Sequence, residues 1–362
     1  MQQLLLIVQP YLTAYRLPVF AKIAECFGDV ILASSPASEK SGYGQQNISG
    51  TAIRRHVLLP ERRLFGGRLI WQQGLLRLLI EIRPSKLLIA ANPRALSFWV
   101  ALFACRWLGI SCYSYGQGIY DKPNPPAWLV KAYQVLVGFS KCYICYTASG
   151  AESMRRQGVR GELAVAENSL QLAEPVPPSE KSGKELGVLF LGRLRIGCNL
   201  SLLITSLALA RSVTGLDLRL HVIGDGELAA ELQSQHASQP WITWYGEVYQ
   251  QSEIRTIAQH CRVGCHPGDA GLSVVHFMGL SLVPVIHDRL DLHMGPEPSY
   301  ICDGKNGCRF LHSEAPQSLP KVLAELFTSN NSAHLAESAF NTYRALTEPP
   351  LAERLLRVLR ER

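Results

Sequence analysis

The sequence has 362 residues, of which 47% are apolar, and a formal net charge of +7. This length and composition favour two domains of ordinary size, each with its own core. The longest apolar run, Ala95 to Ile110, is interrupted by Arg106 and is shorter than the roughly 18 to 20 residues of a membrane span. The segment Met1–Val8 lacks a basic n-region and reads as a first strand, so we expect a cytoplasmic protein.

The positive charge is concentrated in the first half of the chain. Residues 1–170 hold 19 Lys and Arg against 9 Asp and Glu, whereas the remainder holds 17 against 20. The first half has basic pairs on both sides of a segment that we interpret as a helix with Trp71 and Leu75–Leu79 along it: Arg54-Arg55, Arg62-Arg63 and Arg155-Arg156. Such a surface suits an anionic membrane, so a peripheral location on the inner face of the plasma membrane is one expectation. A generic solvated basic face is the alternative, and no nucleic-acid-binding motif accompanies the charge.

The first half alternates short apolar strands with helices. We expect strands at Leu4–Val8, Val30–Ala33, His56–Leu59, Leu87–Ala90, Ser111–Tyr115, Tyr143–Tyr146 and Glu162–Ala166, with helices near Pro18–Cys26, Arg68–Ile82, Leu96–Leu108, Ala127–Gly138 and Ala148–Gln157. This alternation predicts a parallel sheet with helices on both faces, and ligands then bind at the carboxyl ends of the strands. Two loops at such ends are of interest, one with Tyr15 and Arg16 and one with Gln117.

A polar, proline-containing stretch, Leu170–Gly183, separates the two halves and predicts an interdomain linker. A second α/β pattern begins at Glu185. It ends in three amphipathic helices at Gln317–Phe327, Leu335–Leu346 and Leu351–Leu359, the last two separated by Pro349-Pro350.

The stretch Cys265–Leu280 predicts a binding site in the second half. A buried strand, Val263–His266, leads through a turn of small residues into a helix that opens near Gly271, and a further strand ends before His287. The first turn of a helix leaves backbone N–H groups unpaired and carries a partial positive charge, so it suits an anion such as a diphosphate.

Several segments occur in a characteristic order: Val188–Arg195, Leu218–Gly226, Trp244–Gly246, Cys265–Leu280, Gly295–Glu297 and Ile301–Gly307. In this order they resemble the donor domain of family 4 (GT4) glycosyltransferases. The resemblance implies the GT-B fold, in which two Rossmann-like α/β domains face a cleft. It implies an acceptor-binding domain at 1–170, a linker at 171–184, a nucleotide-sugar domain at 185–340, and a C-terminal helix at 341–362 that crosses back to the first domain.

The resemblance also carries residue roles. Gly192 and Arg193 match the Gly-Arg motif that holds the donor diphosphate, and the guanidinium suits this role because it is permanently charged and binds bidentately. The family's lysine five residues further on is Cys198 here, and Arg195 is a candidate for the missing charge. The family's two glutamates, with seven residues between them, are replaced by Gly268 and His276, a variant that we associate with bacterial members.

The remaining expected contacts follow from the same motifs. The donor-binding set is completed by Gly246, Gly271, Leu272 and Ser273, with Asp269 as a free carboxylate for sugar hydroxyls and Glu297 as the family's Pro-Glu residue. The resemblance implies acceptor contacts for Tyr15 and Arg16, although a surface pair at a helix start is an equal alternative, and for Gln117, where many relatives have histidine. No metal ion or other cofactor is expected, because arginines and the helix N-terminus hold the diphosphate in GT-B enzymes.

The implied function is that of a retaining hexosyltransferase that uses a nucleotide sugar to modify a glycan or lipid-linked acceptor in bacterial surface polysaccharide synthesis. A catalytically silent GT-B scaffold that binds a partner glycosyltransferase is the alternative, favoured by Gly268 and Cys198. A nicotinamide-binding Rossmann enzyme is a weaker alternative, because Gly224-Asp225-Gly226 lacks the third glycine of that fingerprint.

Overall fold

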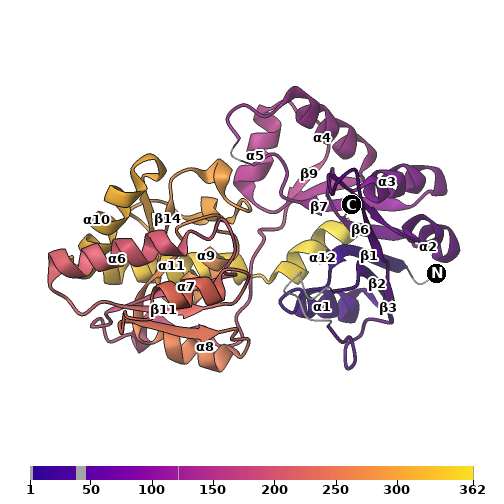
Figure 1. Ribbon diagram of the computed structural model, residues 1–362. Helices are drawn as coiled ribbons and strands as arrows, with labels where there is room; N and C mark the ends of the chain where they lie inside the picture. The colour runs from indigo at the N-terminus through magenta and orange to yellow at the C-terminus, as the bar shows by residue number, and fades with distance from the viewer. Residues whose placement is uncertain (1–2, 38–45, 121, 362) are drawn as a thin grey trace. The chain divides into compact units, whose positions relative to one another are not determined.

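The computed structural model describes residues 3–37, 46–120 and 122–361. It divides into two compact units, one of residues 1–168 with 349–362 and one of residues 169–348 (Figure 1). Each unit is an α/β domain built around a sheet whose paired strands are all parallel.

The first unit follows the alternation expected from the sequence. Its elements are β1 (Leu4–Tyr11), α1 (Leu17–Phe27), β2 (Asp29–Ser35), β3 (Arg55–Leu58), β4 (Glu61–Leu64), β5 (Leu69–Gln72), α2 (Leu75–Ile82), β6 (Lys86–Ala90), α3 (Leu96–Leu108), β7 (Ser111–Gly116), α4 (Ala127–Phe139), β8 (Cys142–Cys145), α5 (Ala148–Arg156), β9 (Leu163–Val165) and the final α12 (Leu351–Glu361). The main sheet has the order β3-β2-β1-β6-β7-β8-β9.

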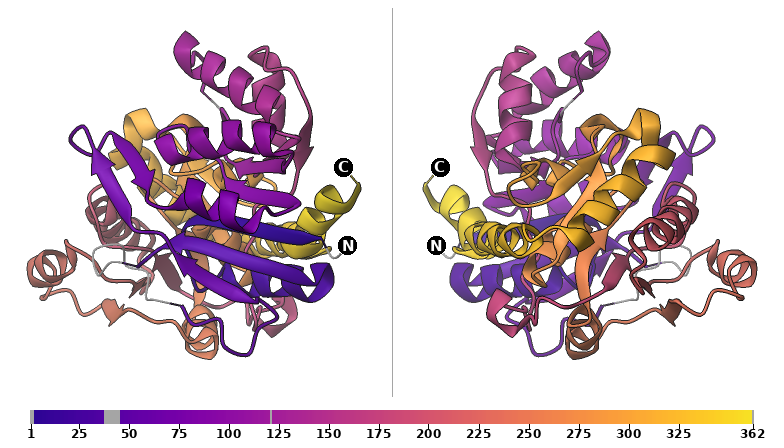
Figure 2. Two further views of the ribbon diagram at one scale, coloured as in Figure 1. Left: turned by 90° about the vertical axis from the view of Figure 1, so that its right-hand side faces the viewer. Right: turned by 90° about the vertical axis from the view of Figure 1, so that its left-hand side faces the viewer.

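Two apolar layers enclose this sheet. One layer joins α2, α3, α4 and α5 to one face of the sheet, and these purple helices lie along the same side of the unit (Figure 2). The other layer joins α1 and α12 to the opposite face. Because both faces are covered, the central strands are apolar almost throughout, as in Leu4–Tyr11 and Lys86–Ala90.

The prediction of a helix at Arg68–Ile82 is wrong for the first half of that range. Residues Leu69–Gln72 form β5, which pairs with β4 as an antiparallel hairpin, and the helix α2 begins only at Leu75. The tip of the hairpin is Phe65-Gly66-Gly67, all with positive φ, and Gly74 precedes α2 with φ of 83°. Gly66 and Gly67 allow the hairpin turn, and Gly74 allows the chain to change direction before α2. A pattern of apolar residues alone does not reveal either feature.

The second unit repeats the architecture with a shorter sheet. Its elements are β10 (Gly187–Leu191), α6 (Leu200–Thr214), β11 (Arg219–Ile223), α7 (Ala229–Gln235), β12 (Ile242–Gly246), α8 (Gln251–Ala258), β13 (Cys261–Cys265), α9 (Ser273–Gly279), β14 (Val283–His287), η4 (Glu297–Tyr300), β15 (Cys308–Phe310), α10 (Ala315–Thr328) and α11 (Ser332–Thr347), with single 3₁₀ turns η2 (Pro178–Glu180), η3 (Leu290–Leu292) and η5 (His312–Glu314). The sheet order is β12-β11-β10-β13-β14-β15. Helices α6 and α10 pack on one face, and α8, α9 and α11 pack on the other.

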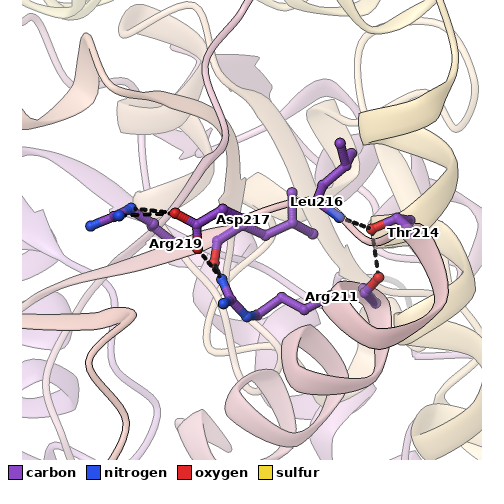
Figure 3. Close-up of polar contacts among 7 residues, drawn as sticks. Arg211, Thr214, Leu216, Asp217 and Arg219 are labelled. Atoms are coloured by element: carbon purple, nitrogen blue, oxygen red, sulfur yellow. Dashed lines mark hydrogen bonds and ion pairs between the residues drawn. The ribbon is translucent and has the colours of Figure 1, made fainter.

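The connection from α6 to β11 shows how side chains fix a helix against its strand. Arg211 near the end of α6 donates to Asp217 Oδ1 at 3.0 Å and to the Leu218 carbonyl oxygen, while Arg219 at the start of β11 donates to Asp217 Oδ2 at 2.9 Å (Figure 3). Thr214 Oγ1 accepts from the Leu216 N–H at 3.3 Å (Figure 3). Asp217 thereby holds both arginines and orients the start of the strand.

The expected linker is not a free connection. Residues 169–184 belong to the second unit, where the Val176 N–H donates to the Gly279 carbonyl oxygen at 3.0 Å and the Leu172 N–H donates to the Tyr343 hydroxyl at 2.8 Å. The chain passes to the first unit again at Pro349, and α12 packs against α1. No helix in the described ranges has both the length and the apolar character needed to cross a bilayer.

Candidate functional site

The strand order of the second sheet reverses direction at one point along its carboxyl edge. The order reverses between β10 and β13, so the loops that leave these two neighbouring strands run to opposite faces of the sheet. In open parallel sheets ligands bind where this reversal occurs. The loops here are Gly192–Asn199 after β10 and His266–Leu272 after β13, and they contain most of the residues predicted to bind the donor.

The loop after β10 meets the loops after β13 and β11 backbone to backbone, which requires glycine. A Cβ on Gly268 would lie 1.9 Å from the Gly197 carbonyl oxygen, and one on Gly224, after β11, would lie 1.8 Å from the Gly192 carbonyl oxygen. The Asp269 N–H also donates to the Gly197 carbonyl oxygen at 3.0 Å. No carboxylate side chain fits at position 268 in this backbone, which gives a physical reason for the missing first glutamate.

Two arginines and one aspartate occupy the loops beside this contact. Arg193 is exposed and lies near Tyr249. The pKa of Tyr249 is raised overall, by burial and by the hydrogen bond to Glu247, and the positive charge of Arg193 partly opposes this rise. Arg195 forms an ion pair with Asp269 Oδ2 at 2.8 Å, and both side chains are about one-quarter to one-third exposed. Asp269 is therefore not the free carboxylate that the sequence suggested, although its Oδ1 has no hydrogen-bond partner within the described ranges.

His293 links the loop after β14 to the loop after β13. Its Nδ1 accepts from the Ala270 N–H at 3.1 Å, its Nε2 lies 3.1 Å from the His287 carbonyl oxygen, and its ring stacks on His287 with centroids 3.8 Å apart. The Met294 N–H donates to the Ala270 carbonyl oxygen at 3.0 Å. Because Nδ1 accepts, Nε2 carries the proton and donates to His287, so the ring is the neutral tautomer.

Two further histidines are buried beneath these loops. His266 stacks on Phe190 and lies under Gly192, and His287 lies between His293 and His312. Burial, with a smaller effect of neighbouring His293, lowers the pKa of His266 to about 4 and that of His287 to about 3. These side chains are neutral at pH 7 and add no charge beneath these loops.

The helix α9 begins at Ser273, two residues after the expected start, and has seven residues. The turn Gly271–Ser273 is half-buried, and a Cβ on Gly271 would meet open space. His276 is 6% exposed, and burial alone lowers the pKa of its ring to about 4. Neither His276 Nε2 nor Ser273 Oγ has a hydrogen-bond partner among the residues that the structure describes.

The other predicted donor residues take different positions. Cys198 is buried in the core beside α6, so its side chain cannot take the place of a lysine at the donor site. Glu297 opens η4, which contacts α9, and is 3% exposed. Gly246 ends β12 with φ of 67° and accepts from the Gly224 N–H at 2.8 Å.

In the first unit, the residues predicted to contact the acceptor lie after β1 and β7. Tyr15 is 39% exposed, whereas Arg16 is buried, donates to Asn168 Oδ1 and lies over the Tyr15 ring. Tyr115 of β7 also donates to Asn168 Oδ1, at 2.9 Å, so the side chain of Asn168 joins the loop after β1 to the end of β7. Gln117 is half-buried in the loop after β7. Arg16 is thus not the surface residue that one interpretation expected.

A small cavity lies at the corresponding strand reversal of the first sheet, between β1 and β6. Its volume is about 30 Å³, and its polar lining includes Gln9, Glu61, Gln72 and Asn92. Gln72 Nε2 donates to the Gln9 carbonyl oxygen at 3.0 Å, whereas Gln9 Nε2 has no hydrogen-bond partner within the described part of the chain. The sequence did not single out these residues.

Sequence reasoning also missed the histidines that support the donor loops. His287 ends β14 and His266 directly follows β13, so their positions at the carboxyl ends of apolar strands were a usable signal. His293 gave no such signal, because its partner Ala270 is 23 residues away in another loop. Within the described ranges no three His, Cys, Asp or Glu residues are placed to hold a metal ion.

Comparisons with known proteins agree with this arrangement. Residues 185–329 match the family model described as Glycosyl transferases group 1, whereas no curated protein sequence matches the chain. Among solved structures, Alr3699/HepE of Anabaena in complex with UDP-glucose is similar with a TM-score of 0.70 and 13% identity, over 99% of this chain and 100% of that one.

Two further solved structures resemble the chain over nearly its whole length. The lipopolysaccharide outer core galactosyltransferase WaaB aligns with a TM-score of 0.67 and 14% identity over 98% of this chain and 99% of that one. The pneumococcal O-GlcNAc transferase GtfA in complex with UDP and GlcNAc aligns with a TM-score of 0.69 and 9% identity over 99% of each chain.

The paired parallel sheets and these likenesses define a GT-B protein with two Rossmann-like domains, as the sequence predicted. The second unit contains the segment that matches the glycosyltransferase family model. That match identifies a glycosyltransferase domain in the second unit, and with it a transferase enzyme.

Proposed function

We propose that this protein transfers a hexose, with retention of anomeric configuration, from a nucleotide sugar to a glycan or lipid-linked acceptor. The observation that carries the proposal is the pair Arg193 and Arg195 on the loop after β10, next to the strand reversal of the second sheet. Fixed cations at this edge suit the diphosphate of a donor. We assign Gly192, Gly268 and the turn Gly271–Ser273 to the same donor site.

The reaction breaks the bond between the anomeric carbon and the diphosphate oxygen, so negative charge develops on the leaving group. In this proposal Arg193 stabilises that charge, because a cation already in position lowers the energy of the developing anion. Arg195 supplies the positive charge that the lysine supplies in members of the family. Its ion pair with Asp269 fixes the guanidinium in advance, and Asp269 Oδ1 remains to accept from a sugar hydroxyl.

The acceptor hydroxyl forms the new bond on the face that the diphosphate leaves. Its proton passes to a leaving phosphate oxygen, so no additional base is needed for this step. In this proposal His276 and Glu297 bind the ribose and sugar of the donor, and Gly246 shapes the adjoining loop. Tyr15, Arg16 and Gln117 contact the acceptor, and no metal ion takes part.

A lipid-linked acceptor of a bacterial surface polysaccharide is the substrate class that we favour. The likeness to a lipopolysaccharide galactosyltransferase and the excess of basic residues in the first half support this choice. A peripheral position on the inner face of the plasma membrane follows from such an acceptor.

A catalytically silent scaffold is the second candidate, and two observations favour it. Gly268 has no room for a side chain, and Cys198 is buried where relatives have lysine. The site would then bind a donor without turning it over, or bind none.

The test combines donor binding with turnover. UDP-, GDP- and dTDP-sugars are screened by thermal shift, because a ligand that binds only the folded state raises Tm. Donors that bind are then assayed for hydrolysis and transfer, with UDP-sugars first because similar structures contain UDP. Binding with turnover supports the enzyme, and binding without turnover supports the scaffold.

Arg193→Ala is the decisive variant. It should lower the transfer rate by at least about a hundredfold, the scale observed when one preorganised charge-stabilising group is removed. Arg219→Ala is the matched control, because Arg219 is an exposed arginine at the amino end of β11, away from the carboxyl edge. Equal rates for Arg193→Ala and the wild type would remove Arg193 from the site.

A further inference from the structure

Helices α3 and α4 expose an unusual set of aromatic side chains. We define the α3–α4 aromatic face as Phe103, Trp107, Trp128 and Phe139, which are 38%, 90%, 68% and 41% exposed. Phe103 and Phe139 touch edge to face with centroids 4.7 Å apart, so the two helices present one surface. Trp107 lies one turn beyond Phe103, and Trp128 lies three turns before Phe139 on the same side of α4.

The charges carried by α3 and α4 are all positive. Neither α3 nor α4 contains an acidic residue, and exposed Arg106 and Lys131 lie next to Trp107 and one turn from Trp128. From Leu75 to Lys141 the chain has eight Lys and Arg residues against Glu81 and Asp121. The face is therefore apolar and aromatic with a basic border.

Most of the apolar residues that we expected on a membrane-facing helix are buried. Leu75, Leu78 and Leu79 of α2 are buried in the core of the first unit, so they cannot contact a partner. The exposed apolar residues of α2 are Leu76 and Ile80, and α2 packs against α3. The exposed apolar surface is thus centred on α3 and α4 rather than on residues 71–79.

The chemistry of this face fits a lipid surface. Exposed apolar patches mark contact sites, and tryptophan is enriched at membrane interfaces because its ring is apolar while its N–H is polar. A protein partner does not require one sign of charge, whereas an anionic lipid layer attracts each nearby Lys or Arg. The basic border without acidic residues on α3 and α4 favours lipid over a second copy of the chain.

We propose that the α3–α4 aromatic face docks on an anionic bilayer, with Trp107 and Trp128 inserted at headgroup level and Arg106 and Lys131 against the lipid phosphates. This inference rests on the membrane contact proposed above and names the surface that makes it. It does not depend on the transfer reaction. The docking would bring the first unit to a lipid-linked acceptor.

The test measures partitioning of the full chain onto vesicles of phosphatidylglycerol and phosphatidylcholine in equal parts, and onto phosphatidylcholine alone. The wild type should bind the anionic vesicles, and its tryptophan emission should be quenched by brominated acyl chains. Trp107→Ser with Trp128→Ser should weaken partitioning about tenfold or more and remove most of the quenching. Arg106→Glu with Lys131→Glu should weaken binding to the anionic vesicles, most strongly at low salt, because salt screens exposed charges.

The matched control is Leu209→Ser with Val213→Ser, two exposed apolar residues on α6 of the second unit, which should bind vesicles as the wild type does. Donor hydrolysis without vesicles should stay at the wild-type level in every variant, so a failed donor site is distinguishable from failed docking. Equal partitioning of the tryptophan variant and the wild type would overturn the proposal. So would a wild type that ignores anionic vesicles, including one that instead forms a dimer that the tryptophan substitutions dissociate.

Discussion

His276 is the residue at which the departure from the family motif can be examined directly. The ring is buried on α9, and its Nε2 has no hydrogen-bond partner among the described residues. A buried polar atom without a hydrogen-bond partner costs free energy. It therefore indicates a bound ligand, a bound water molecule or a loss of stability that the fold tolerates. A neutral imidazole can bond a ribose hydroxyl without placing negative charge near a diphosphate.

We expect His276→Ala to raise the donor KM more than it lowers kcat, because the proposed bond to ribose is present in the ground state and the transition state alike. His276→Glu restores the family's residue and should retain part of the activity. Steady-state kinetics with varied donor, together with a thermal melt of each variant, make the measurement. If both variants fold and have the wild-type donor KM, His276 is a core residue and the alignment at this helix is wrong.

Five buried histidines, His221, His266, His276, His287 and His293, should make the second unit sensitive to acid. Burial lowers the pKa of His266 and His276 to about 4 and that of His287 to about 3, and it also lowers the pKa of His221 and His293. An unfolded histidine titrates near 6.5, so below that pH the unfolded chain binds protons that the folded chain does not. The stabilising contribution is complete above about pH 6.5 and is lost as the pH falls towards 4.

The expected loss for one fully buried histidine is up to about 1.4 kcal/mol for each pH unit in this window. Urea unfolding of the second unit at pH 7.5, 6 and 5 measures it. His276→Leu should reduce the slope by up to about one proton, whereas His334→Gln, at an exposed position on α11, should leave it unchanged. A free energy of unfolding that does not fall between pH 7.5 and 5 would contradict this prediction.

At the scale of elements, apolar periodicity predicted most helices and failed where glycine controls the backbone. The expected helices at Leu96–Leu108 and Ala127–Gly138 match α3 and α4 within a residue. Across Arg68–Ile82 the apolar residues suited a helix, but the turn at Gly66-Gly67 folds Leu69–Gln72 back on β4 instead. A tertiary pairing therefore overrode the local pattern there.

The α6–β11 connection supplies an element-scale prediction. Arg211 is three-quarters buried, binds Asp217 and the Leu218 carbonyl oxygen, and lies over the Trp241 ring at 5.3 Å. Arg211→Ala should lower the free energy of unfolding of the second unit by about 1–3 kcal/mol, because the Leu218 carbonyl and the ring contact lose their partner.

Arg219→Ala is its matched control, since the same aspartate binds Arg219 in an exposed pair that contributes about 0–1 kcal/mol. Chemical denaturation of the two variants side by side measures the difference. Equal losses would mean that the interactions of Arg211 add nothing beyond a surface ion pair.

At the scale of the molecule, the α/β alternation was sufficient to predict two parallel sheets, and with them the edges where ligands bind. The side-chain partners within those edges were not predictable. The contact of His293 with Ala270 joins two loops, and the ion pair of Arg195 with Asp269 spans 74 residues, so neither leaves a local pattern. Gly268 was noted as a missing glutamate, whereas its contact with the Gly197 carbonyl oxygen is a property of the folded backbone.

The position of α12 gives a prediction for the molecule as a whole. Five of its aliphatic side chains, Leu351, Leu355, Leu356, Val358 and Leu359, are at most 8% exposed in the core shared with α1. Burying each contributes about 1.5–3 kcal/mol, and the sum of roughly 8–15 kcal/mol equals the whole stability of a typical domain. A chain that ends at Glu348 should therefore lose the first unit and keep the second.

Hydrogen exchange read by mass spectrometry separates these outcomes. In the truncated chain, amides of β1, β6 and β7 should exchange at rates close to those of an unfolded chain, while β10, β13 and β14 keep their protection. Glu353→Ala with Arg357→Ala, two exposed positions on α12, is the control and should leave both patterns intact. Retained protection across β1, β6 and β7 after truncation would show that the first unit does not need α12, because its sheet would then remain folded with the face beneath that helix uncovered.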